Sequence, residues 1–258
     1  MAVSNITVAE SPLVLYALRR ADDALILGHR LSEWCGHAPL LEEEMALANM
    51  ALDLIGQARE LYSYAAEVEN AGHDEDALAY RRDARQYRNL LLVEQPNGDF
   101  ARTIVRQLLY AAFAEPFWRA TMASNDAPLA AIAAKSHKEC AYHLRHAAEW
   151  VIRLGDGTPE SHRRAQAAVE DLWAFTGEVF HADDSERDLI AAGIAIDPDG
   201  LRIPWRRTIE DVLGRATLIV PPDGWAQSGG RAGRHSEHLG HLLTELQYLQ
   251  RTYPEATW

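Results

Sequence analysis

The stretch KSHKECAYHLRHAAEW, residues 135–150, decides the fold of this chain. At 100° per residue of an α-helix, its side chains divide into an apolar face and a polar face about 80° wide. The apolar face carries Cys140, Leu144, Ala147 and Ala148, which is the pattern of a helix packed in a bundle. The polar face carries Lys135, Glu139, Tyr142, His146 and Glu149, with His143 at its edge. Either this face meets water, with Lys135 and Glu139 paired one turn apart and His137 exposed, or it is half of an iron site.

The rest of the chain is predicted to be helical almost throughout. Helix-start signals such as Ser11-Pro12 and Thr158-Pro159, together with Gly and Pro breaks, delimit the segments. Helices are expected at about 11–33, 42–68, 75–93, 99–123, 126–155, 158–180, 185–193, 205–219 and 235–252. Only IAIDPDGLRIPW, residues 194–205, has an extended pattern, and its Asp-Pro-Asp-Gly turn predicts a small hairpin.

Long helices joined by short loops indicate an all-α antiparallel bundle. We expect a single domain over residues 1–258, with a core bundle at about 11–155 and additional, less regular C-terminal helices at about 185–258. The N-terminal segment has no basic region followed by an apolar one, so no signal peptide is expected.

Charge and composition narrow the classes of partner. The formal net charge is −13, which argues against nucleic acid or an anionic membrane as a partner. No apolar run approaches the roughly 18 residues of a membrane helix. The two cysteines, Cys35 and Cys140, form no disulfide framework and are typical of free thiols in a reducing compartment. The protein is therefore predicted to be cytoplasmic.

A narrow polar stripe interrupts the helix at 42–68. Asn49, Asp53 and Gln57 are four residues apart and lie on one face. This stripe is either solvated or a hydrogen-bonded polar row between helices, or else Asp53 is an inward carboxylate ligand.

Glu115 is the only charged residue between Leu108 and Trp118. A carboxylate in such apolar surroundings costs several kcal/mol unless it is paired, coordinated or protonated. Two alternatives remain open for Glu115: an ion pair with an Arg or Lys of a neighbouring helix, or metal ligation.

The spacing of histidines bears on the iron hypothesis. Di-iron carboxylate bundles take a Glu-x-x-His pair from each of two helices. Three residues after Asp53 stands Gly56, and three after Glu139 stands Tyr142, while His143 is four residues after Glu139. The chain has one Glu-x-x-His, at Glu178 and His181, and a histidine run at 235, 238 and 241 that fits an interface at least as well as a metal.

Four separated stretches carry a family resemblance. They are LSEWCGHAPLLEEEMALANMALDLIGQAREL, KSHKECAYHLRHAAEW, LWAFTGEVF and GRHSEHLGHLLTELQYLQRTYPEATW. Together they resemble the C-type subunit of the bacterial ring-1,2-phenylacetyl-CoA epoxidase, over nearly the whole chain.

The resemblance implies a ferritin-like fold and a place in a multicomponent monooxygenase of aerobic phenylacetate degradation. In such complexes an A-type subunit holds the di-iron centre and the substrate, and a reductase with flavin and an iron–sulfur cluster supplies electrons from NADPH. The C-type subunit is expected to be a structural partner of the catalytic subunit that has lost its iron ligands.

On this view the chain has no catalytic or metal-binding residues and no cofactor. Asp53, Glu115, Glu139 and His143 would be degenerate di-iron positions, with Lys135 as a substitute for the charge of iron. We expect at least one of the three carboxylates to be paired with a basic group, because an empty pocket of carboxylates is unstable.

Other hypotheses stay open at this point. The chain is alternatively a di-iron oxygenase, with Glu33 or a neighbour on the first helix and the four degenerate positions as ligands, or a helical adaptor outside aromatic catabolism. A homodimer in isolation is also possible. A further set of basic residues is either ordinary surface charge or meets CoA phosphates or an acidic partner: Arg202, Arg206, Arg207, Arg231 and Arg234.

Overall fold

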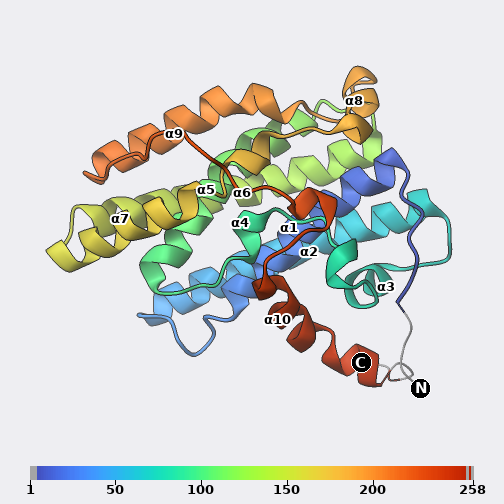
Figure 1. Cartoon of the computed structure of the whole chain (residues 1–258), viewed down its shortest axis with the longest axis horizontal. Helices are drawn as coiled ribbons and strands as arrows, with labels where there is room; N and C mark the ends of the chain where they lie inside the picture. The colour runs from blue at the N-terminus through green and yellow to red at the C-terminus, as the bar shows by residue number, and fades with distance from the viewer. Residues whose placement is uncertain (1–4, 254–255, 257–258) are drawn as a thin grey trace.

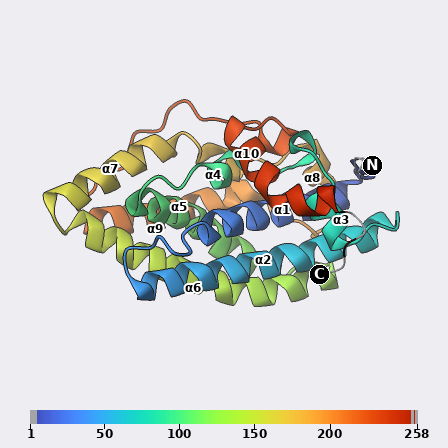
Figure 2. The same cartoon turned by 90° about the horizontal axis from the view of Figure 1, so that it is seen from below.

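Four long helices form the centre of the molecule in the computed structural model, which describes residues 5–253 and residue 256. They are α1 (Pro12–Ser32), α2 (Leu41–Glu69), α5 (Phe100–Thr121) and α6 (Ala127–Gly155). Helix α1 packs along α2, and α5 packs along α6 (Figure 1). Seen from below, α2 and α6 lie side by side (Figure 2). The all-α, ferritin-like antiparallel bundle predicted from the sequence is confirmed.

Local sequence fixes the ends of these helices. The side chains of Ser11, Asp99 and Asp126 each accept a hydrogen bond from a backbone N–H of the first turn, which satisfies a donor that the helix leaves unpaired. Asn70 ends α2 in the left-handed conformation, at φ 54°. The predicted bounds of the four long helices therefore agree with the structure to within two residues.

The remaining elements cover this bundle. They are α3 (Glu75–Tyr80), η1 (Ala84–Gln86), α4 (Leu91–Glu94), α7 (Pro159–Trp173), η2 (Gly177–Phe180), α8 (Asp184–Ala191), η3 (Pro198–Leu201), α9 (Arg202–Arg215), η4 (Gly230–Ala232), α10 (Glu237–Leu246) and α11 (Tyr248–Thr252). Helices α7 and α9 pack against α5 and α6. Residues 1–4, 254–255 and 257–258, the ends of the single predicted domain, lie outside the described residues.

The predicted hairpin at 194–205 is wrong, and no strand occurs in residues 5–253. The Asp197 side chain accepts from the backbone N–H of Asp199 at 3.0 Å and caps the turn η3, which leads directly into α9. Leu201 and Trp205 are buried, so this segment presents its apolar residues with helical spacing.

Three predicted helices were too long. The segment 158–180 ends its α-helix at Trp173, and 235–252 is divided at Gln247. The segment 75–93 is divided into α3, η1 and α4, because its polar groups bind α1 instead of continuing a helix. The backbone N–H groups of Arg88 and Leu90 donate to Asp22 and Asp23, at 2.7 and 2.8 Å.

A buried charge network on α1 anchors this irregular segment. Asp22 also accepts from Tyr62 at 2.5 Å and from both terminal nitrogens of the buried Arg82. Asp23 is bound by Arg231 at 2.7 and 3.0 Å. Each carboxylate is thus surrounded by donors, as a buried charge requires.

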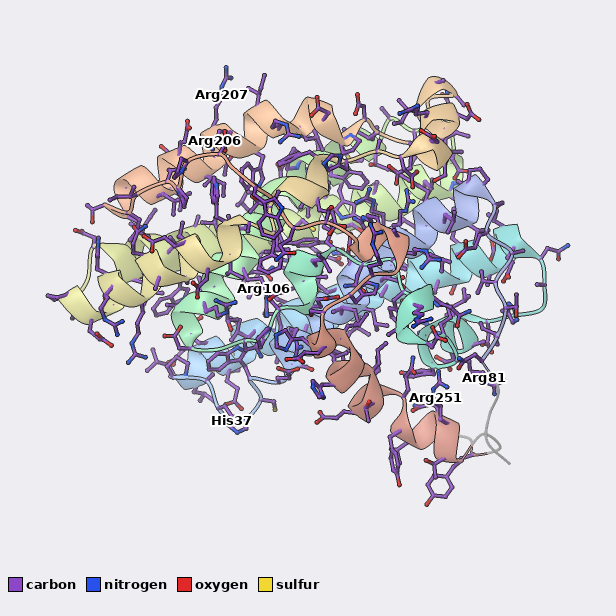
Figure 3. The ribbon with its side chains drawn as sticks, viewed as in Figure 1. His37, Arg81, Arg106, Arg206, Arg207 and Arg251 are labelled. Carbon is purple, nitrogen blue, oxygen red and sulfur yellow. The ribbon has the colours of Figure 1, made fainter. Side chains whose placement is uncertain are left out.

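Another buried cation, Arg106, holds the loop before α5. This residue (labelled in Figure 3) is 1% exposed, and its side chain donates to the Gln95 carbonyl and, at 2.6 Å, to Asn97 Oδ1. Burial, with the charge of Arg30 adding to it, lowers the pKa of Arg106 to about 9.

The C-terminal segment is anchored by an ion pair between His235 and Glu94. One imidazole nitrogen lies 2.7 Å from the Glu94 carboxylate and the other lies 3.0 Å from the Tyr87 carbonyl. Both partners are acceptors, so this geometry favours the doubly protonated imidazolium. Burial lowers the pKa of His235, but the hydrogen bond and charge of Glu94 outweigh it, and the pKa is raised.

We therefore predict that His235→Gln destabilises the protein by about 1–3 kcal/mol at pH 6. A raised pKa in the folded state gives stability that is fully present below the unfolded pKa of about 6.5 and is lost as pH rises through the folded value. The difference in the free energy of unfolding between wild type and variant should become smaller from pH 6 to pH 9. It is measured by urea unfolding. The exposed His37→Gln is the control, and a difference independent of pH would contradict the charged ion pair.

Candidate functional site

The polar faces of α2 and α6 meet in a ladder of four side-chain pairs, which we call the α2–α6 seam. His146 Nε2 lies 2.9 Å from Glu43, and His143 Nε2 lies 3.0 Å from Asp53. Gln57 Nε2 donates to Glu139 at 2.8 Å. The last pair is Lys135 with Glu60. Because the helices are antiparallel, the pairs follow one another in opposite chain order on the two helices.

The polar face of the 135–150 helix is divided between α2 and solvent. Glu139 and His146 are half-buried against α2, whereas Lys135, Tyr142 and Glu149 are exposed, as the solvent-facing interpretation predicts. The expected pair of Lys135 with Glu139 is replaced by Lys135 with Glu60. For Asp53 and Gln57 the structure agrees with the hydrogen-bonded polar row between helices, whereas Asn49 is exposed. The helical period predicted correctly which residues share the polar face, but it could not predict which helix packs against that face.

The seam runs from the core to the surface. The side chain of His143 is 1% exposed, and that of its partner Asp53 is 35% exposed. Burial raises the pKa of Glu139, the Asp53 carboxylate adds to this, and the Gln57 hydrogen bond opposes it. Burial also raises the pKa of the Cys140 thiol, which therefore stays protonated and unreactive at neutral pH.

Glu115 lies on α5, away from the seam, and is paired. Its carboxylate is 3.0 Å from His137 Nε2 on α6 and 3.7 Å from Arg119 on its own helix. The neighbouring helix thus supplies a histidine where an Arg or Lys was expected. The expectation that His137 is exposed is wrong, because this contact half-buries it. At least one carboxylate was expected to have a basic partner, and both Asp53 and Glu115 do, but Lys135 is the direct partner of neither.

The residues present do not fit a di-iron centre. Such a centre needs carboxylates and histidines that converge on one point with free lone pairs. Asp53, Glu115 and Glu139 each engage a protein donor, and Glu33 pairs with Arg30 at 2.7 Å near the surface. Within residues 5–253, no three His, Cys, Asp or Glu side chains are grouped to hold a metal ion.

The sequence matches a known protein family over almost its whole length. Residues 2–258 match the family described as phenylacetic acid catabolic protein. The chain belongs to this family. A curated relative, the C-type subunit of the 1,2-phenylacetyl-CoA epoxidase of Escherichia coli (strain K12), is 50% identical over 246 residues, which cover 95% of this chain and 99% of the relative. The resemblance carried by the four sequence stretches is thereby confirmed.

In this member of the phenylacetic acid catabolic family, the described helices include none long and apolar enough to cross a bilayer. The two residues of the Glu-x-x-His motif, Glu178 and His181, do not face a common metal position. Glu178 is buried and accepts from the N–H groups of Leu91, Gly229 and Arg231, and His181 is exposed.

Sequence reasoning missed the charged residues inside α1. Arg19, Arg20, Asp22 and Asp23 are all buried. Arg231, expected to be surface charge or a contact of CoA or an acidic partner, closes this network by pairing with Asp23. The signal was the run RRADD within the otherwise apolar LVLYALRRADDALIL, a pattern that a buried helix shows only when its charges are paired.

We predict that the seam is a stabilising contact between α2 and α6. A double-mutant cycle on Asp53→Ala and His143→Ala should give a coupling energy of about 0.5–1.5 kcal/mol, because one partner is fully buried. The matched control is the exposed pair Glu149 and Arg153 on the same helix, 3.8 Å apart, which should couple more weakly. Equal coupling of the two pairs in urea unfolding would contradict the prediction.

Proposed function

We propose that this chain is a non-catalytic structural subunit of a phenylacetyl-CoA 1,2-epoxidase complex, which pairs with the di-iron catalytic subunit and stabilises it. The relative from Escherichia coli is the C-type subunit of that epoxidase, and it matches this chain nearly from end to end. The observation that carries the proposal is the α2–α6 seam. There the side chains that a di-iron bundle would use as ligands bind one another across the two helices.

A second observation supports the pairing. The outer face of α2 carries Leu41, Met45, Ala48, Leu52 and Ile55, at alternating intervals of four and three residues. These positions span about 80° of the helix surface. Leu41, Met45 and Leu52 are 71%, 59% and 67% exposed. We call this set the α2 stripe.

The α2 stripe has the spacing of a coiled-coil seam, in which apolar residues receive the side chains of a second helix. Ile55 at one end lies against α1, whereas the described part of this chain leaves Leu41, Met45 and Leu52 exposed. Large apolar side chains that line up on one helix face mark an interaction site more often than scattered ones do. Glu42 and Glu44 flank the stripe, so the matching helix of the catalytic subunit is expected to carry basic residues beside its apolar ones.

The remaining assignments follow from the same proposal. Iron and substrate belong to the catalytic subunit, and flavin, the iron–sulfur cluster and NADPH belong to the reductase subunit. The complex works in the cytoplasm. This chain binds other epoxidase subunits, and in isolation its α2 stripe is available for a homodimer.

We predict that the purified chain holds well under one equivalent of iron after anaerobic reconstitution with ferrous ion. The reason is that the carboxylates and histidines are already hydrogen-bonded to one another and would have to break these contacts to bind metal. Metal analysis and Mössbauer spectroscopy measure this directly. Stoichiometric, antiferromagnetically coupled iron would instead favour the alternative, a di-iron oxygenase acting on an acyl-CoA.

We also predict that Met45→Glu and Leu52→Glu weaken binding to the catalytic subunit at least tenfold, because a carboxylate would have to be buried in the α2 stripe. Affinity is measured by calorimetry with the catalytic subunit of the same organism. Ile219→Glu is the matched control, since Ile219 is 73% exposed and lies outside α2. Unchanged affinity in both stripe variants would place the interface elsewhere.

A further inference from the structure

A groove of about 510 Å³ runs between α2 and α6, where the seam ends at the pair of Lys135 and Glu60. The two helices lie side by side (Figure 2), and the groove is lined by Gly56 and Ser63 of α2 and by the first turns of α6. The side chain of Arg59, another lining residue, is 75% exposed, so the groove opens to solvent. We call it the α2–α6 groove.

Gly56 lies in the middle of the 29-residue helix α2, where a glycine lowers helix stability relative to alanine. Within the chain such a glycine can serve close packing. A Cβ on Gly28 of α1 would approach the Ala51 carbonyl and the Ile55 side chain of α2 to 3.2 Å, so Gly28 lets these two helices meet. At Gly56 a Cβ would meet no described neighbouring atom within 4 Å. The described chain therefore does not require this glycine, and the space beside it is open to another molecule.

Gly56 and Ser63 continue the line of the α2 stripe. Leu52 precedes Gly56 by four residues and Ser63 follows it by seven, so the three lie within about 40° on the helix surface. The outer face of α2 thus carries large apolar side chains in its first half and small side chains in its second half. The distance between two packed helices depends on the side chains at their contact. A helix that lies on the stripe can therefore come closest to α2 at Gly56.

The charged groups of the groove are paired, with one exception. Lys135 is paired with Glu60, and Arg59 is paired with Glu75 of α3 at 3.3 Å. Glu67 lines the same groove and is exposed, and none of the described Lys, Arg or His side chains forms an ion pair with it. A partner that enters the groove is matched in charge when it brings a basic side chain to Glu67.

We propose that a helix of the catalytic subunit lies along the outer face of α2, approaches α2 most closely at Gly56 and places a large apolar side chain in the α2–α6 groove, with a basic side chain beside Glu67. Because the partner is the one that the proposed function assigns to the α2 stripe, this docking position rests on that function. An apolar side chain in the groove removes apolar surface of both molecules from water, which favours binding.

The variant Gly56→Leu of the full-length chain separates folding from binding. A leucine there enters open space and has the higher helix propensity, so Tm should stay equal or rise by about 1–4 °C. The same side chain blocks the approaching helix, so affinity for the catalytic subunit of the same organism, measured by calorimetry, should fall about tenfold or more. The smaller Gly56→Ala should weaken binding less.

Gly214→Leu on α9 is the matched control, because a Cβ at this exposed glycine would also meet no described neighbouring atom within 4 Å. It should leave the affinity unchanged. Glu67→Lys should weaken binding about threefold at low salt and less at high salt, because an exposed charge pair is screened. Its control is Glu245→Lys, at an exposed residue of α10 outside the groove.

Wild-type affinity of Gly56→Leu, while Met45→Glu still weakens binding, would overturn the docking position and leave the proposed function standing. A lower Tm of Gly56→Leu would also overturn it, because the chain itself would then fill the space. Failure of the unmodified chain to bind the catalytic subunit would overturn the proposed function together with the docking position. Self-association, measured by sedimentation, that Gly56→Leu abolishes without affecting the catalytic subunit would make a second copy of this chain the occupant.

Discussion

Two adjacent buried carboxylates on α1, Asp22 and Asp23, are the constraint on which the irregular half of this structure depends. A buried charge without partners costs several kcal/mol, so each must be surrounded by donors. Their donors come from Tyr62 on α2, from the segment around residues 82–90 and from Arg231 near the C-terminus. Because the carboxylates of Asp22 and Asp23 need donors, two segments that are far apart in the sequence pack against the same helix, α1.

The seam and the α2 stripe divide helix α2 between two roles. Its polar side holds α6 through hydrogen bonds that use the groups a metal would otherwise need. Its outer side keeps large apolar residues in water, an arrangement that costs solubility and is typical of a subunit whose partner covers them. Helix α2 thus has three faces: an apolar buried face, a polar face that is hydrogen-bonded to α6, and an outer face with exposed apolar residues.

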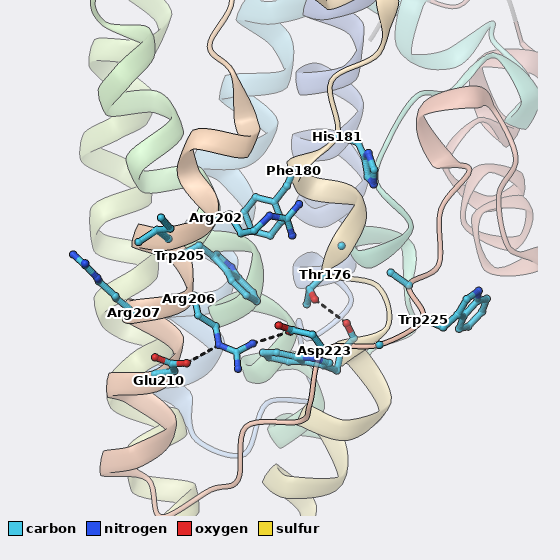
Figure 4. A pocket seen from close by; sticks show the side chains of 15 residues that line it. Thr176, Phe180, His181, Arg202, Trp205, Arg206, Arg207, Glu210, Asp223 and Trp225 are labelled. Atoms are coloured by element: carbon cyan, nitrogen blue, oxygen red, sulfur yellow. Dashed lines mark hydrogen bonds and ion pairs between the residues drawn. The ribbon is translucent and has the colours of Figure 1, made fainter.

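An aromatic cavity of about 590 Å³ belongs to a different part of the fold (Figure 4). Its walls come from η2, α9 and the following loop, which are the elements that the sequence described least well. The cavity exists because the chain after Trp173 leaves its helix, so that Phe180 and Trp205 can pack against each other. The irregular C-terminal third thus has a definite architecture of its own.

The sequence by itself determined the all-α bundle, the four long helices and the family, because periodicity, caps and extended motifs are local or cumulative signals. It also showed that Tyr142 stands three residues after Glu139, at the position where a Glu-x-x-His pair would need a histidine. Only the tertiary structure decided which side chains pair. Lys135 binds Glu60, His137 binds Glu115, and RRADD is a buried network, since each pairing depends on a helix that is remote in sequence. The predicted hairpin failed for the same reason, because burial of Leu201 and Trp205 against the bundle favours a helix.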